Sequence, residues 1–203
     1  MKKLFFYFSV LLFFNLVNAT VINESNFLEF LSEKNYFSAV FVQTTLKEKK
    51  ERKIRGEIIA NRRGMFKVTY RDPLNEIISS NGFQLYRLDL EIEQLDITEI
   101  DATFSESPIS IFSSNKEELE EIFTVKECLI DQEVVTCILE PKSNESFLKS
   151  ASIELMKDEL SSLIYIDSFE QEVTLDFTLV SWDRISDKAF MVEIPEGIDV
   201  VNH

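Results

Sequence analysis

Apolar and polar residues alternate from Lys53 onward, and this period of two constrains the fold more than any other feature of the sequence. Successive side chains of a strand point to opposite faces of a sheet, so the alternation predicts strands with one buried face. Turn-forming residues at 61–64, 71–73 and 80–82 separate the runs, which predicts antiparallel strands joined by short turns. The strand positions include Ile54, Gly56, Ile58 and Ala60, then Phe66, Val68 and Tyr70, then 76–79, and then Phe83, Leu85 and Arg87.

The segments on either side of this region continue the pattern. Residues 23–43 predict a helix, capped by Asn23 or Ser25, that leads into a strand, and the charged residues 44–52 predict a long hairpin turn. Residues 88–100 are expected to continue as another strand with polar interruptions. Later strands are expected at 150–156, 162–167, 172–183 and 190–194.

Residues 105–114 interrupt the strands and predict short helices. Pro108 favours a helix that Ser107 caps, and Ser114 to Glu117 form a capping box for a second helix that runs through Phe123. With four Gly, four Pro, no linker and no internal repeat, the elements are expected to form one closely connected domain. About ten antiparallel strands with short helices predict a mainly β fold, a curved sheet or open barrel with helices on one side.

Residues 1–19 predict a cleaved export signal. Two lysines precede an apolar run over 4–16 and a small-residue cleavage site that ends at Ala19. The run is shorter than the roughly 20 apolar residues of a membrane-spanning helix, although an uncleaved N-terminal anchor is the alternative. No Cys stands near the cleavage site to receive a lipid, so residues 20–203 are expected to form a soluble, unlipidated domain outside the cytoplasm.

Acidic residues outnumber basic residues by 36 to 21, which gives a formal net charge of −15 at pH 7. A chain of this charge repels phosphate backbones and anionic membrane surfaces, so it is not expected to bind nucleic acid. Solubility is the simplest consequence of the acidity. Hydrophobic residues make up 45% of the sequence, and together with their regular pattern they exclude a disordered chain.

Cys128 and Cys137 lie in two short predicted strands. If Gln132 and Glu133 form the tip of the turn between these strands, the two cysteines face each other across the hairpin. In an oxidising compartment such a pair is expected to form a disulfide, a structural staple worth about 2–3 kcal/mol in the chain-entropy model. A redox-active or metal-binding pair is the alternative, but the sequence offers neither a CxxC spacing nor a nearby His.

The sequence offers little enzyme chemistry. Its only histidine, His203, is the last residue, which removes His-based triads, His–Cys dyads and most zinc sites. Acidic pairs such as Asp96 with Glu99 are more simply solvated faces, and no glycine loop could cradle a phosphate. We therefore expect no catalytic residues, no metal and no cofactor. A hydrolase that uses two of the many carboxylates is kept as a hypothesis.

The 18 phenylalanines offer two interpretations. They could fill an ordinary core between sheet and helices, because aromatic side chains bury large apolar areas. They could equally line a cavity for an apolar ligand inside a half-barrel. Composition alone does not decide between a core and a cavity.

Several short motifs occur in a fixed order along the chain. They are Gly56-Glu57 at a strand start, an Arg-containing turn and a Phe-containing strand over 61–68, Pro73, a Ser-Asn-Gly turn followed by Leu-Tyr over 80–86, Ser107-Pro108, and 190–200 with its Pro-x-Gly turn. Together with the initial helix and the strand that follows it, this ordered set resembles the LolA family, the periplasmic outer-membrane lipoprotein carrier proteins. The resemblance covers nearly the whole of residues 20–203.

The chain departs from the family pattern at several positions. Arg63 stands where the family usually has Pro after its Arg, Tyr86 stands where it usually has Trp, and Asn81 replaces an Asp. The cysteine hairpin is not a general feature of the family. These differences leave the implied fold intact and bear on the details of mechanism.

The resemblance implies an open, strongly curved antiparallel half-barrel of about eleven strands, lidded by helices. Its apolar concave face would bind the acyl chains of outer-membrane lipoproteins in the periplasm. An ATP-driven exporter of the inner membrane would load this monomeric carrier, and an outer-membrane receptor would unload it. The alternative is a LolA-like half-barrel that binds a lipid or a protein as a sensor or regulatory module.

The resemblance also implies roles for single residues. Arg62 matches the family arginine that holds the lid closed; a solvated turn residue is the alternative, and a one-residue shift would give the role to Arg63. The cavity is expected to be lined by one strand face and the lid. Its candidates are Phe66, Val68, Tyr70, Leu85, Ile109, Ile111 and Phe112, with Met65 and Tyr86 as alternatives if the other strand face is concave.

Overall fold

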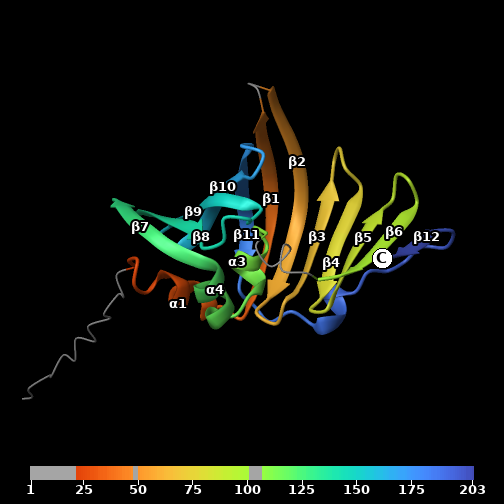
Figure 1. Ribbon diagram of the computed structural model, residues 1–203, viewed down its shortest axis with the longest axis horizontal. Helices are drawn as coiled ribbons and strands as arrows, with labels where there is room; N and C mark the ends of the chain where they lie inside the picture. Colours follow the sequence, from red (N-terminus) through yellow and green to blue (C-terminus); the bar gives the residue numbers. More distant parts are fainter. Residues whose placement is uncertain (1–21, 48–49, 101–106) are drawn as a thin grey trace, which may run out of the picture.

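The computed structural model describes residues 22–47, 50–100 and 107–203, so the predicted export signal and the start of the 105–114 segment lie outside the described residues. Within these ranges one 12-stranded sheet (Figure 1) has the order β12-β6-β5-β4-β3-β2-β1-β11-β10-β9-β8-β7. The strands are β1 (Tyr36–Lys47), β2 (Lys50–Asn61), β3 (Met65–Arg71), β4 (Glu76–Asn81), β5 (Gln84–Asp89), β6 (Gln94–Glu99), β7 (Phe123–Asp131), β8 (Val134–Pro141), β9 (Leu148–Met156), β10 (Glu159–Asp167), β11 (Glu172–Ser181) and β12 (Asp199–Asn202). The helices are α1 (Phe27–Ser32), α3 (Ser110–Ser113), α4 (Lys116–Ile122) and the 3-10 helix η1 (Asp187–Phe190).

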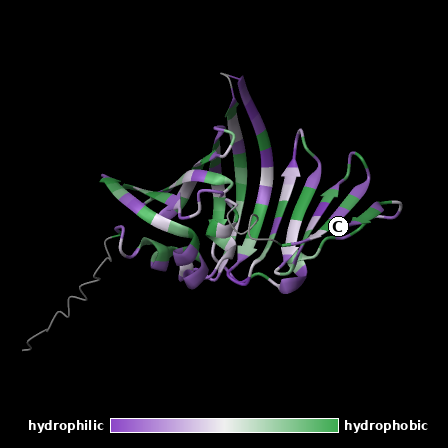
Figure 2. Ribbon diagram, viewed as in Figure 1, coloured by the Kyte–Doolittle hydropathy of each residue, from purple (hydrophilic) through white to green (hydrophobic). Residues whose placement is uncertain are grey.

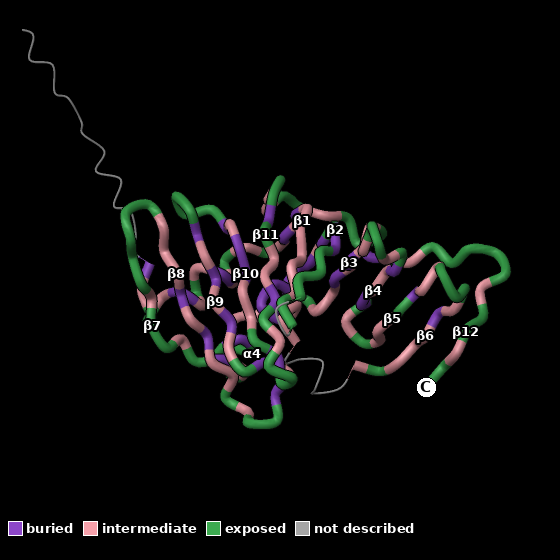
Figure 3. Tube along the Cα trace, turned by 90° about the horizontal axis from the view of Figure 1, so that it is seen from above, coloured by how far each residue is buried: buried purple, intermediate pink, exposed green. Residues whose placement is uncertain are grey.

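The sheet curves and stays open. Seen from above, the strands follow an arc from β7 to β12 with α4 on the concave side (Figure 3). The pairings are antiparallel except that of β12 with β6, which is parallel. The structure thus confirms the predicted open, curved, mainly β fold. It has twelve strands in place of about eleven because residues 199–202 add an edge strand.

Alternate residues of each strand line the concave face, as the period of two predicts. In β1, Phe37, Ala39 and Phe41 are buried, and Figure 2 shows apolar and polar residues alternating along the strands. Gly56 of β2 lies against the ring of Phe41. A Cβ atom at this position would lie 2.4 Å from Phe41 Cζ, so this packing requires a glycine.

The hairpin between β1 and β2 is longer than predicted. The prediction of a turn over 44–52 is wrong, because Thr45 pairs with Arg52 and Lys47 pairs with Lys50. The outer ends of both strands have exposed side chains, so no apolar alternation marks them as strand. Main-chain pairing continues there regardless of side-chain character.

The segment 88–100 is also not one strand. It contains the end of β5, a turn and then β6. Asp89 Oδ1 accepts hydrogen bonds from the backbone N–H groups of Glu91 and Ile92, at 2.9 and 3.3 Å, which stabilises the turn between the strands. An Asp side chain that bonds backbone two residues on is a common turn former.

The predicted strand at 190–194 is wrong as well. Phe190 ends η1 instead, and its side chain is buried against β3 and β4. The hydroxyl of Ser79 donates a hydrogen bond to the Phe190 carbonyl. Phe190 therefore packs on the convex face of the sheet, whereas Met191 and Ile194 are exposed, and the segment does not pair with a strand.

The helix starts lie slightly later than predicted. Asn115, not Ser114, caps α4: its Oδ1 accepts from Glu118 N at 2.9 Å, and its own N–H donates to Glu118 Oε2 at 3.0 Å. Ser114 follows the last residue of α3 and is therefore not free to begin α4. In the same way, α3 begins at Ser110 rather than at Pro108, and α1 follows Asn26.

Candidate functional site

The cysteine hairpin has the predicted geometry. Cys128 faces Cys137 in the β7–β8 ladder, and the two form a disulfide with their Cα atoms 4.1 Å apart. Cys137 is fully buried in the core. Glu24 accepts a hydrogen bond at 2.8 Å from the N–H of Cys128, on the edge strand of the sheet. The prediction of a structural disulfide is confirmed.

A cavity of about 170 Å³ lies between the concave face and α3. Five of the residues predicted to line a cavity are in its wall: Phe66, Val68, Tyr70, Ile109 and Phe112. The other lining residues are Phe41, Gln43, Ile58, Ile78, Ser107, Pro108, Leu163, Tyr165 and Leu175. The wall is thus almost wholly apolar, and the face that carries Phe66 is the concave one.

The remaining candidates lie elsewhere. Ile111 is fully buried in the core, and Leu85 is a partly buried residue that packs against the core from β5. Met65 and Tyr86, the alternatives for the other strand face, line a separate cavity of about 210 Å³ together with Phe190. Neither pair of residues therefore lines the cavity under α3.

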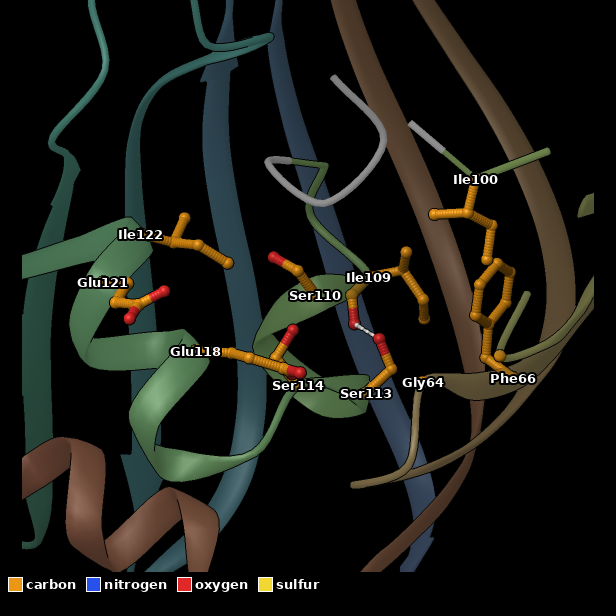
Figure 4. Close-up of a pocket in the computed structure, with 11 residues that line it drawn as sticks. Gly64, Phe66, Ile100, Ile109, Ser110, Ser113, Ser114, Glu118, Glu121 and Ile122 are labelled. Atoms are coloured by element: carbon orange, nitrogen blue, oxygen red, sulfur yellow. Dashed lines mark hydrogen bonds between the residues drawn. The ribbon is translucent and has the colours of Figure 1, made fainter. Parts of the chain in front are cut away.

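A second cavity, of about 280 Å³, adjoins the first, because Phe66 and Ile109 line both. Figure 4 shows it between α3 and α4 on one side and the strand that carries Phe66 on the other. Its wall is more polar, with the hydroxyls of Ser110, Ser113 and Ser114. The two cavities flank α3, so displacement of this short helix would join them.

Aromatic contacts hold α3 against the concave face. The ring of Phe112 stacks on Phe37 with centroids 4.3 Å apart, and meets Phe177 edge-on at 5.8 Å. Phe112 is 2% exposed. Full burial of one such side chain is worth about 1.5–3 kcal/mol, which is small enough for a ligand with long apolar chains to replace.

The side chain of Arg62 forms four hydrogen bonds at this site. It lies in the turn after β2, and its guanidinium donates to four backbone carbonyls of two helical regions. Nη1 donates to Ile111 at 2.7 Å and to Ser114 at 3.0 Å; Nη2 donates to Leu31 at 2.6 Å; Nε donates to Lys34 at 3.1 Å. One side chain thus ties the end of α3 to the end of α1.

The electrostatics of Arg62 explain why carbonyls are its partners. Burial lowers its pKa to about 10, so the guanidinium is still a cation at neutral pH. In the described part of the chain no carboxylate pairs with it. The last carbonyls of a helix have no intrahelical partner and carry the negative end of the helix dipole, so they can satisfy a buried cation.

Arg63 points to a different part of the molecule. Its guanidinium forms an ion pair with Asp187 of η1, and the side chain is more than half exposed. The hydrogen bond to Asp187 raises the pKa of Arg63. The two adjacent arginines therefore contact opposite sides of the sheet, and only Arg62 reaches α3.

Sequence reasoning missed the cavity residues of the second half of the chain. Leu163, Tyr165 and Leu175 reach the cavity because β11 pairs with β1, which brings the C-terminal strands beside Gln43. The alternation of apolar and polar residues predicted that each of these strands has one buried face. No local pattern shows which distant strand lies beside β1, so the cavity wall could not be assembled from the sequence.

Two negative observations apply to the described ranges 22–47, 50–100 and 107–203. None of their helices is long and apolar enough to cross a membrane. Nor do three or more His, Cys, Asp or Glu side chains gather there as they would around a metal ion.

Comparison with known proteins places these features in a family. The family model described as outer membrane lipoprotein carrier protein LolA matches residues 32–193. An outer-membrane lipoprotein carrier protein from Hahella chejuensis is 31% identical over 169 residues, which cover 81% of each chain. A protein of the same description from Neisseria meningitidis is 26% identical over 176 residues, covering 86% of this chain and 84% of that protein.

Solved structures show the same fold. A LolA superfamily protein from Nitrosomonas europaea has a TM-score of 0.53 at 10% identity, covering 85% of this chain and 99% of that one. An uncharacterised conserved protein from Thermus thermophilus has a TM-score of 0.55, also at 10% identity, covering 87% and 96%. At this identity the likeness speaks for the fold alone.

Proposed function

Because this chain belongs to the LolA family of outer membrane lipoprotein carrier proteins, we propose that it carries acylated lipoproteins across the periplasm. The observation that carries the proposal is the apolar cavity on the concave face, covered by a short helix that Arg62 holds. In this proposal residues 1–19 are removed on export, and residues 20–203 act as a monomer without catalytic residues, metal or cofactor. An ATP-driven exporter of the inner membrane loads the carrier, and a receptor in the outer membrane unloads it.

The physical need for a carrier comes from the acyl chains. Each methylene that leaves water is stabilised by about 0.8 kcal/mol. A protein with long acyl chains therefore does not leave a membrane for the aqueous periplasm unless another apolar surface replaces the membrane. An open sheet with an apolar concave face supplies such a surface, and its open edges let the cargo depart again.

The size of the cavity supports a lid that moves. Small-molecule sites usually measure about 300–1,000 Å³, whereas the cavity under α3 measures about 170 Å³. The closed arrangement is therefore too small for several long chains. Movement of α3 would join this cavity to the adjoining one of about 280 Å³ and expose the ring of Phe37 that Phe112 now covers.

Arg62 is proposed as the residue that sets how firmly the lid closes. Its hydrogen bonds to Ile111 and Ser114 are made only while α3 lies in its present position. A lid that competes with cargo lowers the apparent affinity of the cavity, since binding must first displace the closed state. The carrier could then bind lipid tightly enough to solubilise it and weakly enough to release it.

The proposed function is tested with one purified client lipoprotein and its non-acylated form. The mature carrier should keep the acylated client in the supernatant after ultracentrifugation, and should not associate with the non-acylated client. Val68→Glu places a carboxylate in the cavity wall and should abolish this activity. Thr69→Glu, one residue along β3 and on the other face, is the matched control, with circular dichroism to check both folds. Equal treatment of the two clients would contradict the proposal.

A further inference from the structure

The cavity under α3 is largely apolar, and its two tyrosines lie toward one end. Phe37 and Phe112 mark the lid end, where α3 packs on the sheet. Away from it along β1, Phe41 lies opposite Gly56, which lies opposite Tyr70 of β3. Farther still, Thr45 lies opposite Val173, which pairs with Tyr165 of β10. The two tyrosines that line the cavity therefore lie at the end remote from the stacked phenylalanines.

The hydroxyls of these tyrosines have no hydrogen-bond partner within the described part of the chain, although both side chains are at least half-buried. Burial raises the pKa of Tyr70 to about 12, with a further contribution from the Glu76 carboxylate. Burial also raises the pKa of Tyr165, and the nearby Tyr70 adds to this effect. Both groups are thus neutral O–H donors at neutral pH, close to each other, and without an acceptor among the described residues.

Ser107 supplies an independent observation at the same cavity. It precedes α3 and lines the cavity, and its Oγ atom is buried without a hydrogen-bond partner among the described residues. Buried polar groups in proteins are nearly always paired, because an unpaired one is unfavourable. The buried, unpaired hydroxyl of Ser107 and the two tyrosine hydroxyls of the same apolar cavity together indicate a ligand that brings acceptors to them.

We propose that Tyr70 and Tyr165 form a polar subsite that hydrogen-bonds the carbonyl groups where acyl chains join the head of the cargo lipid, with Ser107 as a third donor. The inference rests on the proposed carrier function and specifies how the cargo lies. The chains run toward Phe37 and Phe112, and their ester or amide carbonyls face the hydroxyls. Carbonyl oxygens only accept hydrogen bonds, which complements a site whose tyrosines donate. Ester carbonyls of this kind occur in the lipid anchor of lipoproteins and in glycerophospholipids.

The test compares a cysteine peptide that carries two ester-linked acyl chains and one amide-linked chain with the analogue whose two esters are replaced by ethers. The ether analogue keeps the chains and removes the two ester carbonyls, while the carbonyl of the amide-linked chain remains. Since a neutral hydrogen bond contributes roughly two- to tenfold in affinity, the wild type should prefer the ester form by about tenfold. Tyr70→Phe with Tyr165→Phe should reduce this preference, because it should weaken binding of the ester form more than binding of the ether form.

Tyr86→Phe is the matched control, because it deletes a phenol hydroxyl of the convex-side cavity that hydrogen-bonds Asn81 and Gln84. It should keep the full ester preference. A third arm compares a diester phospholipid with its diether analogue and identifies the source. A preference for the ester form as large as that measured with the peptides assigns the subsite to glycerolipids in general, and a weaker preference assigns it to lipoproteins. Equal wild-type affinity for ester and ether peptides, or an unchanged preference in the double variant, would overturn the subsite alone. Failure to bind either acylated peptide would overturn the carrier function together with it.

Discussion

Arg62 shows how much one side chain contributes to this site. Its five N–H donors form a planar fork, and the structure directs them at the carbonyls of Leu31, Lys34, Ile111 and Ser114. A lysine could not reach four acceptors from one position. The sequence offered Arg62 and Arg63 as alternatives, because both lie in the same turn. Only the fold separates them, since their side chains leave the turn on opposite sides.

Substitution of Arg62 tests the proposed lid at this scale. Arg62→Leu removes the bonds that hold α3 closed, so the open state should gain population and cargo should bind more tightly. We expect lipoproteins to load onto the variant but to be released slowly, so that they accumulate on it. A transfer assay from loaded carrier to receptor-containing membranes measures this. Arg63→Leu, which faces η1, should transfer at the wild-type rate, and normal transfer by Arg62→Leu would remove Arg62 from the mechanism.

Among the elements, the two short helices depend on local hydrogen bonds more than on helix propensity. A helix of seven residues such as α4 is too short to be stable by itself. Its capping box and the packing of Leu119, which is fully buried, fix its start and its orientation. The sequence predicted a capping box in the right place but shifted by one residue, because Ser114 and Asn115 are both good caps.

The position of the cap leads to a paired prediction. Asn115→Ala should lower the free energy of unfolding by about 0.5–2 kcal/mol, the usual cost of losing a cap. Ser114→Ala leaves the Ser114 carbonyl available to Arg62 and the capping box intact, so its effect should be smaller than that of Asn115→Ala. Urea denaturation of both variants measures the difference. The reverse order of the two effects would show that Ser114 is the cap.

The disulfide hairpin gives a second prediction at the scale of elements. The ten-residue loop closed by Cys128 and Cys137 is short, so the chain-entropy model gives about 2–3 kcal/mol of stabilisation. The free energy of unfolding of the double variant Cys128→Ser, Cys137→Ser should be lower by this amount. Urea denaturation measures the difference as a lower midpoint. Reduced wild-type protein is the control and should match the variant. An unchanged urea midpoint would show that the disulfide does not stabilise the fold.

At the scale of the whole molecule, the period of two predicted most of the strands and the open, curved sheet. It failed where strands project beyond the core, as in 44–52, and where apolar residues pack on the convex face, as around Phe190. It could not place β11 beside β1, because that pairing joins segments more than 120 residues apart. For this reason the part of the cavity wall formed by Leu163, Tyr165 and Leu175 stayed hidden in the sequence.

The fold also explains how a carrier of this kind combines rigidity with one movable part. The long β1–β2 and β1–β11 ladders make the centre of the sheet rigid. The lid, in contrast, is one turn of helix held by an arginine and a phenylalanine. Cargo binding is therefore expected to move α3 and to leave the sheet unchanged.

Fluorescence of Trp182 tests the central claim, that acyl chains enter the concave cavity and displace the lid. Trp182 is the only tryptophan of the chain, and its ring lies 5.1 Å from that of Phe37, on which Phe112 stacks. Bromine atoms near the ends of the acyl chains quench tryptophan only at close range. A triacylated cysteine peptide with brominated chains should quench Trp182 in proportion to binding, whereas the same peptide without bromine should not. Binding of the brominated peptide without quenching would contradict the account.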